Sequence, residues 1–520
     1  MAPFLLSQSM ALLSLPLLVL CFLIIVLVVV DASRSSFSSS ASASTDVVTS
    51  LPGFTGPLPT RMWSGLVESL PGMHSHYILA ECTAPPCATI AWFQGGPGAS
   101  SMYGMFVEFG PLVFKGSDVK LNVNPYSWTH LANTLVIDSP PPVGFSYCDP
   151  AGPSGNGTSC GPWDDASTAS VNDAALRAWA KRHPQHAANG LIIAGESYAG
   201  VYVPTLVKRL VENVHDPPPF KVLGAAVGDP CAPPAVCGVG NAPLFHVLFA
   251  HGHGQMSYKN FEAIMNACGG LSGLARLEAP SRFDGCGDAL KRADVDAGKV
   301  YPYGEYDDCN HAGDPFRRRR SLLSEASEPR QWFLRRPSIV PLEEQPPPPP
   351  PFHAYPGGVA SGGAPCGSLR ALGAWLAEAE TKTALNVPAT SNFFECDNGV
   401  GFNYTLSEKN VLAIWSDLVQ RMPVLVYNGD TDPGLNFYVT QNWTSKGIAG
   451  IVEREAWRPW TVDGNHRLGG FVTRYASEGA GRFDFATIHG SGHMVPAFKP
   501  VQALALFEQW MSNAFKRYAP

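Results

Sequence analysis

Charged side chains are scarce in this sequence, because only 15% of its 520 residues are Asp, Glu, Lys or Arg and the formal net charge is −7. Proteins that bind nucleic acids neutralise phosphates with clustered Lys and Arg, so this composition predicts no nucleic-acid partner. The chain also lacks a convincing internal repeat. With 45% hydrophobic residues it can nevertheless bury a large core, and its length suits one large α/β domain with an inserted cap.

Basic residues are absent before the long apolar run at residues 11–30, which only Ser14 and Pro16 interrupt. About twenty apolar residues are enough to span a bilayer, whereas the core of a cleaved signal peptide is usually shorter. Small residues follow over 35–44 and suit a signal peptidase. We interpret residues 1–34 as a signal peptide, with a signal anchor that tethers the protein to a membrane as the alternative. Residues 35–49 then form a Ser/Ala-rich linker.

Cysteine use agrees with delivery to the secretory lumen, where disulfides persist. Of twelve cysteines, Cys21 lies in the apolar run. Three pairs are close enough in sequence to predict local bridges: Cys82 with Cys87, Cys148 with Cys160, and Cys231 with Cys237. Three N-glycosylation sequons, at Asn156, Asn403 and Asn442, fit the same compartment. We therefore expect a protein of the secretory pathway that ends in a vacuole, in a lysosome-like compartment or outside the cell.

Residues 191–200, Leu-Ile-Ile-Ala-Gly-Glu-Ser-Tyr-Ala-Gly, have the pattern of a nucleophile elbow. The apolar run predicts a buried strand, and the apolar residues at helical spacing after it predict a helix. Between them, small residues flank Ser197, which leaves room for a sharp turn that exposes the hydroxyl. A Gly-containing turn with a solvated serine is the alternative if this pattern stands alone.

Two later apolar runs each end in a loop with a complementary residue type. Residues 424–427 lead into Asn-Gly-Asp-Thr-Asp at 428–432, and residues 485–488 lead into His-Gly-Ser-Gly-His at 489–493. The chain order Ser, Asp, His is that of α/β-hydrolases. A serine hydroxyl is a weak nucleophile, so an imidazole must accept its proton and a carboxylate must orient that imidazole. This chemistry implies neither a metal nor a cofactor.

These motifs resemble the serine carboxypeptidase family, which includes vacuolar and lysosomal carboxypeptidases. The resemblance extends to Trp-Phe-Gln-Gly-Gly-Pro-Gly at 92–98, Glu-Phe-Gly-Pro at 108–111 and Gly-Phe-Ser-Tyr at 144–147. It covers most of residues 51–515 and is weakest between about 230 and 400. It implies an α/β-hydrolase fold with a mostly parallel central sheet, formed by residues 50–228 and 388–520, and an inserted cap over 229–387.

The resemblance also implies roles for individual residues. Ser197 is the expected nucleophile, His493 the base and Asp432 the acid, in preference to His489 and Asp430, which stand in the same loops. The amides of Gly96 and Tyr198 are expected to form the oxyanion hole. The free carboxylate of a peptide is expected to bind at four residues: Gln94, Gly95, Glu108 and Glu196. The family normally has Asn at the first of these, so the longer Gln94 is a departure.

A pH dependence follows from that carboxylate site. A carboxylate that approaches two glutamates is repelled unless a proton is shared among the three groups. We therefore expect kcat/KM for peptides to rise as the pH falls from neutral.

The clearest change of composition lies in residues 312–365, which include four arginines at 317–320 and six prolines at 346–351. Consecutive prolines favour extended polyproline II, and an exposed basic segment is a target for proteases. Some family members are cut here into two disulfide-linked chains, and the alternative is an uncut linker. The family also has cysteine where this chain has Ala99, usually bridged to a position that resembles Cys396, so Cys396 is left free or re-paired.

The sequence therefore predicts a serine-type carboxypeptidase that cleaves the C-terminal bond of peptides or proteins through an acyl-enzyme, at acidic pH. One alternative is an acyltransferase, because plant family members use the same triad to move acyl groups from sugar esters. Those proteins typically carry Asp before the nucleophile, so Glu196 favours the peptidase. A secreted binding protein with weak catalysis is the other alternative. The sequence leaves open whether the protein is a monomer or a homodimer.

Overall fold

The structure, a computed structural model, describes residues 46–237, 243–276, 285–297, 301, 303–307, 309, 366–395, 402–464 and 466–515. Several predictions lie outside these residues: the signal segment 1–34, nearly all of the linker 35–49, the Arg/Pro-rich segment 312–365 and Cys396. Among the helices in the described ranges, none is long and apolar enough to cross a membrane.

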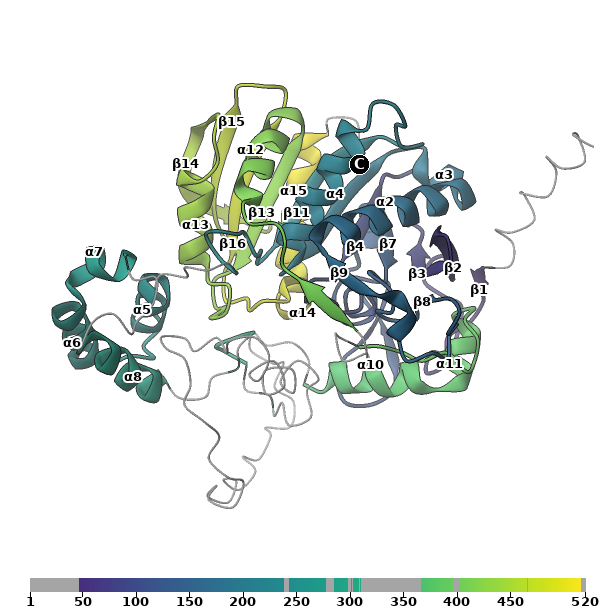
Figure 1. The fold of residues 1–520 in the computed structure, drawn as a ribbon, viewed down its shortest axis with the longest axis horizontal. Helices are drawn as coiled ribbons and strands as arrows, with labels where there is room; N and C mark the ends of the chain where they lie inside the picture. Colours follow the sequence, from purple (N-terminus) through teal and green to yellow (C-terminus); the bar gives the residue numbers. More distant parts are fainter. Residues whose placement is uncertain are drawn as a thin grey trace, which may run out of the picture. The chain divides into compact units, whose positions relative to one another are not determined.

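The core is a large mixed sheet in which β2, β3, β7, β4, β10, β11, β13, β16, β15 and β14 are neighbours in that order (Figure 1). The run from β7 to β16 is parallel, and the strands on either side of it are antiparallel. This arrangement confirms the predicted α/β-hydrolase fold. The strands of this sheet are β2 (Met62–Leu70), β3 (Met73–Ala80), β4 (Thr89–Phe93), β7 (Asn133–Ile137), β10 (Leu191–Glu196), β11 (Val222–Gly228), β13 (Pro423–Gly429), β14 (Ile451–Thr461), β15 (Leu468–Ser477) and β16 (Arg482–Ile488).

The remaining strands are short: β1 (Val47–Val48), β5 (Leu112–Phe114), β6 (Leu121–Val123), β8 (Tyr147–Cys148), β9 (Pro162–Asp164) and β12 (Asn403–Thr405). Four of these strands form two separate two-stranded sheets, in which β5 pairs with β6 and β9 pairs with β12.

The parallel strands are mostly apolar because both faces of the sheet are covered. Every residue of β10 is buried, as are all five of β4 and all five of β7. One face packs against α2 (Asp165–Arg182), α4 (Ala199–Glu212), α12 (Val411–Arg421) and α13 (Phe437–Lys446), the first three of which can be followed in Figure 1. The other face packs against the π-helical turn η1 (Gly104–Glu108), α10 (Ser368–Ala377), α14 (Val495–Phe498) and α15 (Pro500–Ala514).

Two helices begin where their residues dictate. Asp164 caps α2, since its carboxylate accepts a hydrogen bond from the Ser167 amide, which would otherwise have no helical partner. Proline at the first position of α15 has no amide to leave unpaired. Phe507 and Met511 of α15, which lie four residues apart on one face of the helix, are buried in the core.

Between β11 and β13 the chain forms helices α5 (Pro243–Gly252), α6 (Tyr258–Cys268), α7 (Gly270–Ala275) and α8 (Cys286–Ala297). These four helices share a small apolar cluster of their own, which includes Val247, Ile264 and Leu290. Helix α10, in contrast, buries Leu372 and Trp375 in the main core. Two short helices, α3 (Pro184–Ala187) and α11 (Ala379–Ala384), complete the set of α-helices in the described residues.

All ten cysteines in the described part of the chain are paired. Three bridges, Cys82–Cys87, Cys148–Cys160 and Cys231–Cys237, confirm the local pairs predicted from spacing. The other two are Cys268–Cys286 and Cys309–Cys366. The last joins cysteines with a sequence separation of 57, and the Arg/Pro-rich segment lies between them.

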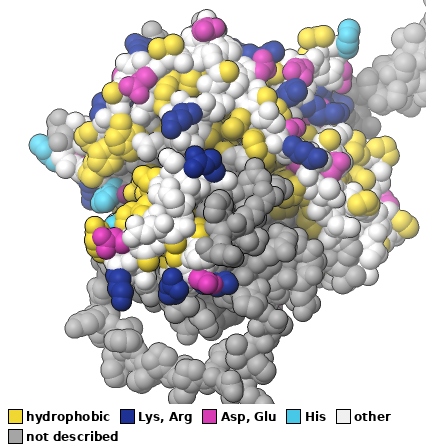
Figure 2. Space-filling model, turned by 60° about the vertical axis from the view of Figure 1, so that its left-hand side comes forward, with side chains coloured by type: hydrophobic (Ala, Val, Ile, Leu, Met, Phe, Trp, Pro, Cys, Tyr) yellow, Lys and Arg dark blue, Asp and Glu magenta, His cyan; other side chains and the backbone are white. Residues whose placement is uncertain are grey.

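The face in Figure 2 carries basic and acidic side chains interspersed with apolar ones. No broad field of a single charge is visible on this face, in keeping with the low content of charged residues.

Candidate active site

The predicted catalytic loops all leave the sheet at its carboxyl edge. Pairing in register places Glu196 at the end of β10 opposite Gly228 of β11, which in turn lies opposite Tyr427 of β13. Gly429 at the end of β13 lies opposite Ile488 of β16. Because these strands are parallel, the loops after 196, 228, 429 and 488 emerge side by side, which is where ligands bind in α/β sheets.

Ser197 occupies a sharp turn between β10 and α4. Its φ of 64° lies in the left-handed region, which is unusual for a residue with a side chain. The turn is fixed by the Ser197 amide, which donates to the Gly228 carbonyl at 2.9 Å, and by the Cys231 amide, which donates to the Ser197 carbonyl at 2.8 Å. A Cβ on Gly195 would lie 2.2 Å from the Phe93 carbonyl oxygen, so the small residue is required there. This geometry is that of a nucleophile elbow.

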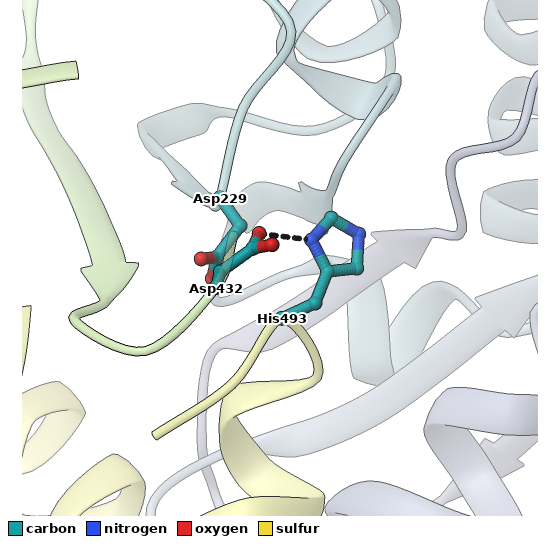
Figure 3. Close-up of side chains that lie close together, drawn as sticks. All are labelled: Asp229, Asp432 and His493. Atoms are coloured by element: carbon teal, nitrogen blue, oxygen red, sulfur yellow. Dashed lines mark hydrogen bonds and ion pairs between the residues drawn. The ribbon is translucent and has the colours of Figure 1, made fainter. Parts of the chain in front are cut away.

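His493 and Asp432 form a buried pair. The Nδ1 of His493 lies 2.6 Å from Oδ2 of Asp432, and the two side chains are 6% and 0% exposed (Figure 3). The other carboxylate oxygen, Oδ1, accepts from the amides of Gly434 and Leu435 at 2.7 and 3.3 Å. In this geometry an Nδ1–H would donate to the carboxylate and leave Nε2 available as a base. Among the described residues, neither ring nitrogen of His493 is hydrogen-bonded to the Ser197 hydroxyl.

The alternative residues of the same loops form a separate pair. Asp430 Oδ2 lies 2.9 Å from Nδ1 of His489, and the His489 side chain is 61% exposed. Asp430 also accepts from the Gly490 amide at 2.6 Å, which ties the two loops together. The buried pair is thus the one that the sequence prediction preferred.

A further carboxyl group, which was not predicted from the sequence, lies close to the buried pair of Asp432 and His493. Asp229 follows β11 directly, is fully buried, and has an oxygen within 4.8 Å of ligand atoms of both Asp432 and His493. Its Oδ1 accepts from Asn428 Nδ2 at 2.8 Å and from the Gly429 amide at 3.0 Å. An acidic residue directly after a buried apolar strand was the signal that could have revealed it, since Asp432 and His493 also follow such strands.

The glycine loop after β4 lies against the elbow. A Cβ on Gly95 would lie 2.5 Å from the Tyr198 nitrogen and 2.7 Å from Ser197 Cβ, so only glycine permits this approach. Gly96 has a φ of 118°, a conformation that residues with side chains rarely adopt. The structure therefore brings the predicted oxyanion residues, Gly96 and Tyr198, into neighbouring segments beside the predicted nucleophile.

The predicted carboxylate-binding side chains are buried together. Gln94 is 5% exposed, Glu108 2% and Glu196 1%. Gln94 Nε2 donates to Oε1 of Glu196 at 2.6 Å, while Gln94 Oε1 accepts from Nε1 of Trp92 at 2.7 Å. The longer Gln94 side chain is thus held at both ends of its amide.

The two glutamates at this site favour the protonated state. Burial raises the pKa of Glu108 to about 8, although the neighbouring Glu196 and Gln94 side chains offset part of the effect. Burial also raises the pKa of Glu196, and the charge of Glu108 raises it further. Both Glu108 oxygens and one Glu196 oxygen are buried and make no well-aligned hydrogen bond in the described structure. Protonated carboxyl groups with unused hydrogen-bonding capacity can donate to an anionic ligand.

The three sequons differ in accessibility. Asn156 and Asn403 are exposed, the first near a short 3₁₀ turn and the second in β12. Asn442 is half-buried within α13, and Thr444 of its sequon is fully buried, with its hydroxyl donating to the Thr440 carbonyl at 2.8 Å.

A parallel sheet whose carboxyl edge holds a strained serine, a glycine loop and a buried histidine–aspartate pair defines an α/β-hydrolase. Comparison with known proteins narrows this class. The profile of the serine carboxypeptidase family matches residues 52–513, so the protein belongs to that family and is a hydrolase of the serine-type carboxypeptidase class.

Relatives match almost end to end at modest identity. Serine carboxypeptidase 1 of Hordeum vulgare is 29% identical over 90% of this chain and 92% of its own length. The lysosomal protective protein of Mus musculus is 28% identical, over 90% of this chain and 94% of its own length. Among solved structures, Kex1(Δ)p, a prohormone-processing carboxypeptidase from Saccharomyces cerevisiae, shares the fold with a TM-score of 0.65 at 18% identity, covering 91% of this chain and 96% of that chain.

Proposed function

We propose that the protein releases the C-terminal residue of peptides or proteins through an acyl-enzyme formed on Ser197. The observation that carries this proposal is the buried Glu108–Glu196–Gln94 cluster, whose Glu196 directly precedes the serine of the elbow. An endopeptidase or a general esterase has no need for acids that stay protonated beside its nucleophile. A carboxypeptidase needs them to bind the substrate's free carboxylate.

The reaction follows from the proposed roles. His493 Nε2 accepts the hydroxyl proton as Ser197 Oγ attacks the scissile carbonyl carbon, and Asp432 holds Nδ1 through the 2.6 Å hydrogen bond. The amides of Gly96 and Tyr198 donate to the oxyanion. Collapse of the intermediate breaks the C–N bond, and His493 returns the proton to the leaving amine. Water then attacks the acyl-enzyme by the same route and frees the shortened peptide.

Substrate selection follows from the protonation of the two glutamates. At mildly acidic pH the substrate carboxylate is ionised while Glu108 and Glu196 are protonated, so each glutamate can donate a charge-assisted hydrogen bond. An amidated C-terminus offers no negative charge to these donors. The same carboxylate places the scissile bond next to Ser197, so recognition and chemistry are coupled.

The test compares a blocked dipeptide that has a free carboxylate with the same dipeptide carrying a C-terminal amide, at pH 5. The proposal expects kcat/KM for the free acid to exceed that for the amide by about 100-fold, the worth of two charge-assisted hydrogen bonds. Glu108→Gln should reduce this preference while leaving fluorophosphonate labelling of Ser197 intact. Ser197→Ala should abolish both dipeptide hydrolysis and labelling. Equal rates on the two dipeptides would exclude carboxylate recognition.

An acyltransferase is the second candidate, because one observation favours it. Gln94 stands where the family normally has the shorter Asn, and its amide is already satisfied by Trp92 and Glu196. An amide engaged at both ends has less capacity to bind a peptide carboxylate. Transfer of an acyl group from a sugar ester in the absence of peptide turnover, with Ser197 still labelled, would support this candidate.

The proposed compartment is the secretory lumen, with a vacuole, a lysosome-like organelle or the exterior as destination. Five disulfides support it, since such bridges persist in oxidising compartments. A relative is named a lysosomal protective protein. We propose glycans on Asn156 and Asn403, whose side chains are exposed.

A further inference from the structure

We propose that Asp229 is a positioning residue for the catalytic imidazole. The Asp229 carboxyl group holds a proton and donates it in a hydrogen bond to the Asp432 carboxylate. The inference rests on the proposed function, in that it takes Asp432 and His493 as members of the catalytic triad. It assigns to Asp229 a role that the triad itself does not include.

Carboxyl groups are crowded beside the imidazole of His493. Asp229 and Asp432 are both fully buried, and an oxygen of each lies within 4.8 Å of the other and of a His493 ring nitrogen. Figure 3 shows both carboxyl groups at the Nδ1 side of the imidazole ring. Two ionised carboxylates at this range in a dry site repel strongly, so one of them holds a proton.

The hydrogen bonds decide which carboxyl group is neutral. Asp432 accepts three: from His493 Nδ1 and from the amides of Gly434 and Leu435. These donors stabilise a negative charge on Asp432. Asp229 accepts two hydrogen bonds, both at Oδ1.

The second oxygen of Asp229 is buried and accepts no hydrogen bond within the described structure. A buried acceptor without a donor is costly, but the cost disappears if this oxygen carries a proton and donates it. Asp432 is the acceptor within reach. The structure therefore supports a neutral Asp229 that donates to a charged Asp432.

The surrounding groups act in the same direction. Burial raises the pKa of Asp229 far above its usual range, and the nearby charge of Asp432 raises it further. The Gly429 amide opposes this shift by stabilising the charged form. Tyr427, whose ring lies beside Gly228, is also fully buried and remains neutral, because burial raises the pKa of its hydroxyl. The titratable groups that face Asp229 are thus Asp432, His493, Glu196 and Tyr427.

This hydrogen bond has a consequence for the base. A donor to Asp432 withdraws electron density from the carboxylate that faces Nδ1–H, so the imidazolium form of His493 is stabilised less. The neutral imidazole, which is the form that accepts the Ser197 proton, is thereby favoured over the imidazolium.

Two substitutions separate the hydrogen bond from the charge. Asp229→Asn keeps an acceptor oxygen for Asn428 and Gly429 and replaces the O–H with an N–H donor toward Asp432. Asp229→Gly removes the side chain without backbone strain, because Asp229 has a φ of 43°, which glycine adopts freely. Thermal melting of each variant identifies any loss of folding.

The readout is the rate of fluorophosphonate labelling of the full-length protein as a function of pH. This reaction needs a neutral His493 but no substrate carboxylate, so Glu108 and Glu196 do not contribute to its acidic limb. Ser197→Ala is the control that must abolish labelling. Absence of labelling in the wild type would overturn the proposed function, whereas the outcomes below concern Asp229 in an enzyme that is labelled normally.

We expect Asp229→Asn to label within about threefold of the wild type with an unchanged acidic limb, since a neutral donor is retained. Asp229→Gly should move the acidic limb upward by about 0.5–1 pH unit, because an Asp432 carboxylate that no longer accepts this hydrogen bond stabilises the imidazolium more strongly. A loss of more than about tenfold in a stably folded Asp229→Asn variant would mean that a negative charge is needed, and would overturn the proposal.

Two further results would contradict it. An acidic limb in Asp229→Gly identical to that of the wild type would show that Asp229 does not influence the imidazole. Loss of labelling after dialysis against a chelator, restored by a divalent cation, would show that a cation rather than a proton lies between the two carboxylates. If Asp229→Gly fails to fold, the labelling rate of Asp229→Asn decides the question alone.

Discussion

His493 Nδ1 lies 2.6 Å from Asp432 Oδ2 in a buried pair, and the same two loops hold His489 and Asp430 as a second pair 2.9 Å apart at the surface. One protein thus offers a candidate pair and its matched control, composed of the same residue types a few positions apart. The two pairs differ mainly in exposure and in their place in the loops. Asp430 and His489 directly follow strands β13 and β16, whereas Asp432 and His493 stand further along the same loops.

The first prediction uses this duplication. Asp432→Asn should lower kcat by about 10⁴-fold, because the amide would stabilise the wrong imidazole tautomer. Asp430→Asn, its control, should keep kcat within about threefold, since a partly exposed pair that joins two loops contributes little. Steady-state kinetics on a blocked dipeptide check both variants. A large loss in Asp430→Asn and none in Asp432→Asn would reverse the assignment of the acid.

The second prediction concerns substrate binding and pH. The pKa of Glu108, raised to about 8 by burial, means that the acid pair is protonated below that pH and begins to ionise above it. KM for a free-acid dipeptide should therefore rise as the pH passes through about 8, by roughly tenfold per unit. The amide of the same dipeptide should show no such rise. A KM for the free acid that stays constant from pH 6 to 9 would contradict the role of Glu108.

A third prediction links the same group to stability. In the unfolded chain Glu108 ionises near pH 4.5, whereas in the folded protein its pKa is about 8. Folding therefore favours the protonated form, and stability is lost as the pH rises from the unfolded toward the folded pKa. Glu108→Gln should melt with a smaller decrease between pH 5 and pH 8 than the wild type, by on the order of 1–3 °C. Differential scanning fluorimetry at the two pH values measures this, and equal decreases would count against a neutral Glu108.

The fourth prediction concerns a loss of stability at acidic rather than alkaline pH, caused by a histidine away from the catalytic loops. Burial lowers the pKa of His183 to about 3, assisted by the nearby His186 and Arg182. The Tyr77 hydroxyl lies 2.7 Å from its Nε2 and can donate to the neutral ring. The unfolded chain binds a proton below pH 6.5 and the folded chain does not, so stability is lost as the pH falls from 6.5 toward 3.

His183→Gln keeps an acceptor for Tyr77 but cannot be protonated. The variant should therefore lose less thermal stability than the wild type between pH 6.5 and pH 4. A wild-type decrease in this interval that is unchanged in the variant would exclude His183 as a source of acid sensitivity. A Lys181→Gln variant on the neighbouring helical turn is a suitable control for the change in surface composition.

The fifth prediction concerns processing. Limited digestion with trypsin, which cuts after arginine, should cleave the segment that contains Arg317–Arg320. The Cys309–Cys366 bridge spans this segment. The product should therefore migrate as one species on a non-reducing gel and as two on a reducing gel. Two species without reductant would show that the bridge is absent.

Much of the fold followed from local pattern. The strand at 191–196 and the helix after it were predicted because an apolar run, small residues and helical spacing occur together in one stretch. The short-range disulfides were predicted for the same reason, since a sequence separation of 5 to 12 keeps the two cysteines close together. The family motifs then led to the α/β-hydrolase fold.

What the sequence could not show depends on contacts between distant segments. The Cys309–Cys366 bridge was missed because a separation of 57 residues carries no information about folded distance. Asp229 was missed because its position beside Asp432 depends on the pairing of β11 with β13 in register. The engagement of both ends of the Gln94 amide likewise needs Trp92 and Glu196 in place. The roles of the individual site residues stay predictions until the variants above are measured.

The position of the Cys309–Cys366 bridge has a consequence for how the active site would be assembled after such a cut. Ser197 and Asp229 precede the cut, whereas Asp432 and His493 follow it. The nucleophile would then belong to one polypeptide and its base to another, so the mature enzyme would be a covalent heterodimer with a shared active site. Strands β11 and β13, which come from the two polypeptides, would still pair at its centre.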